Sequence, residues 1–172
     1  PRRTKGYEEA ARIGTILAAA VLKTLPSLAP VADGAVQVRS QTVTLAMPTE
    51  KGARLAESFG NAPTFFDGEV QVTNRQGRQT FEAEVQVISI GNDLAWVSFP
   101  GEMFVELGLA LKQASPFRWT IIHGIANGAI GYVPNLRAYP EGAYGAGASR
   151  CAPGSGEELV ETATRLLVKM HS

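Results

Sequence analysis

The sequence predicts an α/β protein, with α+β as the alternative, in which amphipathic helices at both ends of the chain pack on a mixed sheet. Helical apolar periodicity marks the two ends, over 7–25 and 155–170, and strand-like apolar runs lie between them. Strand, helix and strand follow one another over 94–126, and a crossover of this length favours parallel pairing. We therefore expect one sheet that contains both parallel and antiparallel strands.

The first helix is predicted over residues 7–25. Acidic residues stand in its first turn, Lys23 in its last, and Pro26 follows, as is typical of helix ends. Its apolar run, Ile13 to Leu22, falls far short of the ~20 residues that cross a bilayer, so we expect a buried helix. The apolar stripe is Ala10, Ile13, Leu17, Val21 and Leu25.

Extended segments are expected next, after a turn-rich stretch at 27–34, with a short helix at 49–58 between the first two. Asn74 to Arg78 is a hairpin loop by composition, and Trp96 lies in a near-continuous apolar run that is typical of an interior strand, where we expect it in the core. The predicted strands are Val36–Met47, Gly68–Thr73, Thr80–Ile90 and Leu94–Phe99.

Pro100 and Gly101 end the last of these strands, before a helix expected over 103–114 and a strand over 118–126. In a right-handed parallel crossover both strands end at one sheet edge, which is where such sheets bind ligands. Residues 134–154 lack periodicity and are expected to form a long loop.

The closing helix carries two signals. Ser155 to Glu158 has the pattern of a capping box, and an apolar stripe follows it at helical spacing. The stripe is Leu159, Ala163, Leu166, Leu167 and Met170.

Bulk composition excludes several classes of function. At 172 residues the chain fits a single domain over 1–172. Its 16 basic and 16 acidic side chains leave no net charge, so we expect no nucleic-acid partner. Nothing in the composition favours an anionic membrane, and contact with a membrane surface stays open. The single cysteine, Cys151, excludes an intrachain disulfide and an all-cysteine metal site, but leaves the compartment open.

Polar residues gather at the predicted sheet edge. Glu102 begins a helix, where it either interacts with the helix dipole or acts as a metal ligand or general base. Tyr132 is either half-buried packing or part of a site, and its shared edge with Glu102 favours the second interpretation. We expect His123 to be a core histidine and His171 to be solvated.

The sequence does not match three common catalytic or nucleotide-binding motifs. Gly154-Ser155-Gly156 is not a nucleophile elbow, because proline and glutamate occupy the positions where that motif needs glycine. The glycines over 142–147 lack the order of a dinucleotide fingerprint, and no phosphate-binding loop is present.

The passage from Gly91 to Glu102, together with 124–127, Gly131-Tyr132, Tyr139 and Tyr144, resembles the neutral ceramidase family. The similarity is to the C-terminal portion of that family's catalytic domain and extends over most of the chain. It implies a zinc amidohydrolase of sphingolipid metabolism that splits the amide of ceramide or a related N-acyl lipid. It also suggests a secreted or cell-surface location.

The resemblance assigns separate roles to three residues. Glu102 and Tyr132 correspond to zinc ligands, and Tyr144 corresponds to a tyrosine that donates a hydrogen bond to the oxygen of the scissile carbonyl. A carboxylate suits zinc, and a phenol can bind it as phenolate when the cation stabilises the charge.

Three features depart from the family. Nothing matches its two histidine ligands, Gly145 stands where ceramidases favour glutamate, and we expect no immunoglobulin-like module after the last helix. We therefore expect the chain, which begins at Pro1, to be a fragment or processed subunit that works with an N-terminal half, covalently attached or separate. The alternatives are a zinc hydrolase of another N-acyl amine and a non-catalytic assembly or binding module.

Overall fold

The computed structural model describes residues 6–31, 34–49, 65–66, 70–75 and 78–171, and the chain forms two compact units, Pro1–Val31 and Ala32–Ser172. The first unit holds α1 (Tyr7–Thr24), which confirms the predicted helix, and the short 3-10 helix η1 (Leu25–Ser27). No residue of α1 is buried, so the expectation of a buried helix is not met within this chain. Its packing on the sheet, and a single domain over 1–172, stay predictions.

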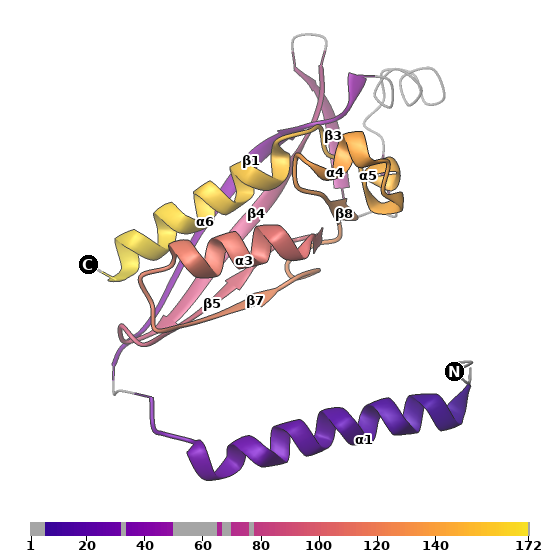
Figure 1. Ribbon diagram of the computed structural model, residues 1–172. Coiled ribbons are helices and arrows are strands. Elements are labelled where there is room, and N and C mark those ends of the chain that lie inside the picture. Colours follow the sequence, from indigo (N-terminus) through magenta and orange to yellow (C-terminus); the bar gives the residue numbers. More distant parts are fainter. Residues whose placement is uncertain (1–5, 32–33, 50–64, 67–69, 76–77, 172) are drawn as a thin grey trace. The chain divides into compact units, whose positions relative to one another are not determined.

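The second unit is built on a mixed sheet, which confirms the predicted class (Figure 1). The long β4 is the central strand of this sheet. β1 pairs with it antiparallel on one side, and β3 and β5 pair antiparallel with its two ends on the other. β5 and β7 are parallel, as the crossover predicts. In the described residues the strands of this sheet are β1 (Val36–Ala46), β2 (Phe65–Phe66), β3 (Val70–Arg75), β4 (Arg78–Ile90), β5 (Leu94–Ser98) and β7 (Trp119–His123).

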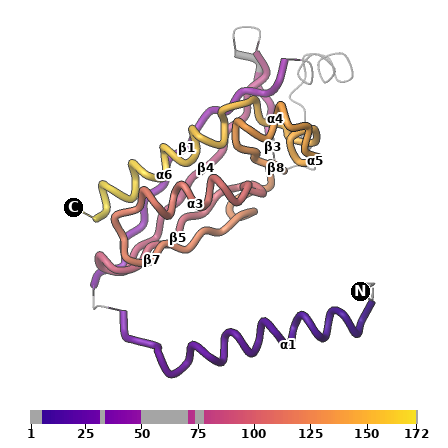
Figure 2. The backbone as a smooth tube through the Cα atoms, in the orientation of Figure 1, coloured from indigo at the N-terminus to yellow at the C-terminus, as the bar shows by residue number. Residues whose placement is uncertain are grey.

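Two helices cover one face of the sheet. α3 (Val105–Ala114) connects β5 to β7 and packs beside α6 (Ser155–His171), as the ribbon and the tube both show (Figures 1 and 2). All five residues of the predicted α6 stripe are buried. The two helices approach closely at Gly156, where a Cβ would lie 2.6 Å from the Leu107 side chain, so a larger residue there would force them apart.

A second, two-stranded sheet lies beyond the end of β5. β6 (Glu102–Met103) and β8 (Tyr132–Val133) pair in parallel. After β8 come two short helices, α4 (Ala138–Glu141) and α5 (Tyr144–Ala148), where the sequence predicts a long loop. Four or five residues make little more than one turn, which is too short to show a helical period.

The remaining differences are local. The hairpin is confirmed, with Arg75 opposite Arg78, whereas most of the helix expected at 49–58 lies outside the described residues. Trp96 is only partly buried. Ser155, which the sequence predicts as the helix cap, is instead the first residue of α6. The amide of Glu158 donates to the carbonyl of Gly154 (3.1 Å), so Gly154 is the residue that precedes the helix. No helix in the described part of the chain has the length and apolarity that a membrane crossing needs.

Candidate active site

The backbone places Glu102 directly beside Tyr132. In the β6–β8 ladder these two residues are register partners. The amide of Glu102 donates to the carbonyl of Gly131 (2.9 Å), and the amide of Phe104 donates to the carbonyl of Val133 (3.0 Å). Partners in register project their side chains to the same face, so the expectation that Glu102 and Tyr132 lie side by side is confirmed, although they do so in a separate two-stranded sheet.

Glycine makes this pairing possible. A Cβ at Gly101 would lie 2.8 Å from the carbonyl oxygen of Gly131 and 2.8 Å from the Val133 side chain, so position 101 has no room for a larger residue. On the other strand, Gly131 has φ +80° and Asn127 has φ 62°, left-handed conformations that favour glycine and asparagine. The Pro-Gly-Glu and Asn-to-Tyr segments therefore fold into a tight local frame.

Tyr144 joins the pair from α5. Its ring meets the Tyr132 ring edge to face, with 5.9 Å between centroids and 78° between planes. The adjacent Gly145 lies against Phe104, because a Cβ there would be 2.8 Å from two atoms of that ring. The structure thus gathers Glu102, Tyr132 and Tyr144, and it explains why glutamate does not fit at position 145 without displacing the Phe104 ring.

Tyr139 and Ser149 form hydrogen bonds with the backbone around the site. The Tyr139 hydroxyl donates to the carbonyl of Cys151 (2.8 Å), and burial raises the pKa of Tyr139 although its hydrogen bond with Ser149 acts to lower it. The buried Ser149 hydroxyl donates to the carbonyl of Tyr132 (2.8 Å) and accepts from the amide of Cys151 (3.0 Å). Sequence reasoning missed Ser149, because no motif or period marks it, and the helical periodicity placed Phe104 only in the apolar stripe of the helix expected over 103–114.

The two histidines differ from expectation. His123 is exposed at the end of β7, so its assignment to the core is wrong: it stands on the sheet face away from α3 and α6. His171 is partly buried, with its ring 5.1 Å from that of Phe117, because the end of α6 packs on the core instead of fraying. Across the described ranges, no three His, Cys, Asp or Glu side chains gather as a metal site.

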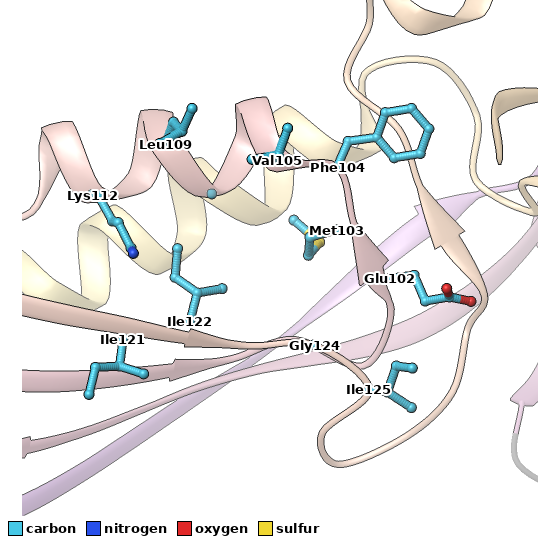
Figure 3. Close-up of a pocket in the computed structure, with 11 residues that line it drawn as sticks. Glu102, Met103, Phe104, Val105, Leu109, Lys112, Ile121, Ile122, Gly124 and Ile125 are labelled. Atoms are coloured by element: carbon cyan, nitrogen blue, oxygen red, sulfur yellow. The ribbon is translucent and has the colours of Figure 1, made fainter. Parts of the chain in front are cut away.

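A pocket of about 550 Å³ adjoins Glu102. It lies between α3 and β7, with Glu102 and Lys112 toward opposite ends in Figure 3. Most of its lining side chains are aliphatic or aromatic, among them Met103, Phe104, Leu109, Ile121, Ile122 and Ile125. An apolar groove that ends at a carboxylate suits a ligand with a hydrocarbon part and a polar end.

The donor chemistry at this edge fits zinc in part. Zinc is held by nitrogen, sulfur and carboxylate oxygen ligands, and a catalytic site has three protein ligands and a water. The exposed Glu102 carboxylate and the partly buried Tyr132 phenol could supply two.

Comparison with solved structures shows that the chain shares its fold with part of a ceramidase. The structure of a ceramidase complexed with C2 superimposes with a TM-score of 0.53 at 15% sequence identity, covering 80% of this chain and 31% of that one. A neutral ceramidase from Pseudomonas aeruginosa gives a TM-score of 0.49 at 17% identity, covering 81% of this chain and 29% of that one. No protein-family model and no curated protein matches the chain.

The resemblance to ceramidases is therefore confirmed at the level of the fold. The chain spans 31% of the length of the ceramidase complexed with C2, so the shared fold corresponds to one part of that ceramidase.

Proposed function

We propose that this chain forms one wall of the active site of a zinc amidohydrolase of the neutral ceramidase type, with Glu102 and Tyr132 as metal ligands and Tyr144 as the hydrogen-bond donor to the substrate carbonyl. One observation carries the proposal: Glu102 is the register partner of Tyr132, whose ring contacts Tyr144, within a fold shared with a ceramidase. Three separate segments each contribute one residue, and Tyr132 is the neighbour of the other two.

The three side chains have complementary tasks in amide hydrolysis. When bound, zinc would polarise the carbonyl and lower the pKa of a bound water to about 7. Glu102 would contribute an anionic oxygen that balances part of the metal charge. The Tyr132 phenol would bind as phenolate, and the Tyr144 hydroxyl would stabilise negative charge that develops on the carbonyl oxygen.

The pocket supports an acylated substrate. Its wall of Met103, Leu109 and Ile122 offers apolar contact to a hydrocarbon chain, and Glu102 marks the end at which an amide would be cleaved. Ceramide and related N-acyl lipids combine these features, so they are the proposed substrate class.

A complete site needs the remainder of the protein. With two candidate ligands in this chain, we assign the others to an N-terminal portion of the catalytic domain, either covalently joined or present as a separate chain. The 31% span of the ceramidase structure supports this arrangement.

The test uses the complete protein and a panel of N-acyl amines that vary in acyl length and headgroup. Glu102→Gln and Tyr132→Phe should abolish hydrolysis, while Glu106→Gln, which changes another exposed carboxylate in the adjoining helix, should retain it. Hydrolysis of only non-sphingoid amides would favour the alternative hydrolase. A complete protein without activity, altered by these variants in stability alone, would favour a non-catalytic module.

A further inference from the structure

Two rows of large apolar side chains cross the main sheet. In the first row Val36 pairs with Ile90, which pairs with Leu94, which pairs with Trp119. Residues paired in register project from the same face of a sheet. The second row, formed in the same way, is Val38, Ile88, Trp96 and Ile121.

These eight residues, which we call the apolar face, lie on the side of the sheet away from α3 and α6. Side chains alternate along each strand, and the neighbours Val87, Ala95 and Val97 are fully buried in the core on the helix side. On the apolar face, Val36, Val38, Trp119 and Ile121 are 66%, 57%, 56% and 40% exposed.

An apolar face of this extent indicates a covering layer. Monomeric soluble proteins rarely expose contiguous apolar patches larger than a few hundred Å². A mainly antiparallel sheet that leaves one face in water normally carries polar side chains on that face, whereas these two rows are apolar and are expected to pack against another element. Four strands contribute to the patch, so the layer has to span the sheet and not only its edge.

The next row along the same face is polar and leads to the candidate site. It consists of Ser40, Gln86, Ser98 and His123. Ser98 ends β5 just before Pro100-Gly101-Glu102, and His123 precedes Gly124 and Ile125, which line the pocket beside Glu102. A layer seated on the apolar face would therefore have one border next to the site.

We propose that the apolar face is the docking surface for the N-terminal portion of the ceramidase-like catalytic domain, and that docking there brings the missing part of the metal site to Glu102. This inference rests on the proposed function. Its occupant follows from the 31% span, which leaves most of a ceramidase-sized protein outside this chain, and from the polar row that joins the apolar face to the site.

The tryptophans provide a direct probe. The chain has two, Trp96 and Trp119, and both lie in the apolar face. The 172-residue chain is labelled with 5-fluorotryptophan, and the proposed N-terminal portion of the catalytic domain is added as a separate unlabelled chain. Docking on this face should shift both ¹⁹F resonances and protect both rings from acrylamide quenching.

A matched pair of variants tests the surface. Val38→Lys introduces a charge into the apolar face, whereas Val168→Lys introduces the same charge on α6; the two valines are 57% and 51% exposed, so both variants should fold. Burial of an unpaired charge should weaken association at least about tenfold for Val38→Lys. Val168→Lys should bind within about twofold of the parent chain, as surface substitutions usually do.

Three results would overturn the inference: association that leaves both resonances unchanged, equal binding by Val38→Lys and Val168→Lys, or rings already protected in the isolated chain. Concentration-dependent protection would assign the face to a second copy, and concentration-independent protection would assign it to another part of this chain. Glu102→Gln should associate normally, so loss of hydrolysis with intact docking separates the proposed chemistry from the proposed surface.

Discussion

The rings of Tyr132 and Tyr144 meet edge to face with 5.9 Å between their centroids. Tyr132 belongs to the strand that pairs with β6, whereas Tyr144 is the first residue of α5. An aromatic pair of this kind contributes about 0.5–1.5 kcal/mol beyond its buried area. The contact therefore fixes the proposed carbonyl donor beside the proposed metal ligand, although Tyr144 is 80% exposed.

Tyr144→Phe separates the hydroxyl from the ring contact. The variant keeps the edge-to-face pair, so the free energy of unfolding should change by less than about 0.5 kcal/mol. Loss of an oxyanion-type donor should lower kcat by about 10²–10³. Steady-state kinetics of the complete protein check this, and a kcat within a few-fold of the parent would exclude the donor role.

Gly145→Ala should disturb the site through packing. Its Cβ would lie 2.8 Å from the Phe104 ring, and overpacking of this kind costs about 1–3 kcal/mol. Gly147→Ala is the control in the same helix, because nothing lies within 4 Å of its Cβ, and it should be neutral or slightly stabilising. Urea unfolding of both variants measures the difference; equal stability would show that Phe104 moves aside freely.

Tyr139→Phe should lower stability without a direct effect on chemistry. The change removes the hydrogen bond to the carbonyl of Cys151, which is worth about 0.5–1.5 kcal/mol. Denaturant unfolding gives the loss, and kinetics below the unfolding transition should match the parent. A fall in kcat as large as that of Tyr144→Phe would show that Tyr139 takes part in the chemistry and would contradict its purely structural role.

The raised pKa of Tyr139 also predicts a pH dependence. Burial favours the neutral phenol, so its contribution to stability is fully present below the ordinary tyrosine pKa of about 10 and is lost as the pH rises through the higher pKa of the folded state. The free energy of unfolding should therefore fall more steeply above pH ~10 in the parent than in Tyr139→Phe. Parallel pH profiles for the two proteins would contradict this.

Much of the fold could be predicted from patterns that repeat over many residues. The α6 stripe, the hairpin between β3 and β4 and the parallel pairing of β5 with β7 all extend over several turns or residue pairs. Many residues therefore contribute to the same prediction. The two short helices after β8 could not be predicted, because each has about one turn. Burial of α1 was predicted from its apolar stripe, yet such a stripe shows an affinity for a partner and not the partner's presence.

The sequence predicts that Glu102 and Tyr132 lie close together, but it does not predict the residues that hold them in place. Strand order brings Glu102 and Tyr132 to one edge, and their direct register follows from how Gly101 and Gly131 fit together. Ser149 and Phe104 act through contacts across sequence-distant segments, which no local spacing records. His123 was misassigned because an apolar strand with one open face exposes every second residue.

Zinc analysis tests the central claim most directly. We expect the isolated 172-residue chain to hold zinc weakly and below one equivalent, and the complete protein to hold one tightly bound zinc that is lost on Glu102→Ala and retained on Glu106→Ala. Stoichiometric, tight zinc in the isolated chain would contradict a site divided between this chain and the rest of the protein. Zinc retained in full by Glu102→Ala would contradict the role of Glu102 as a ligand.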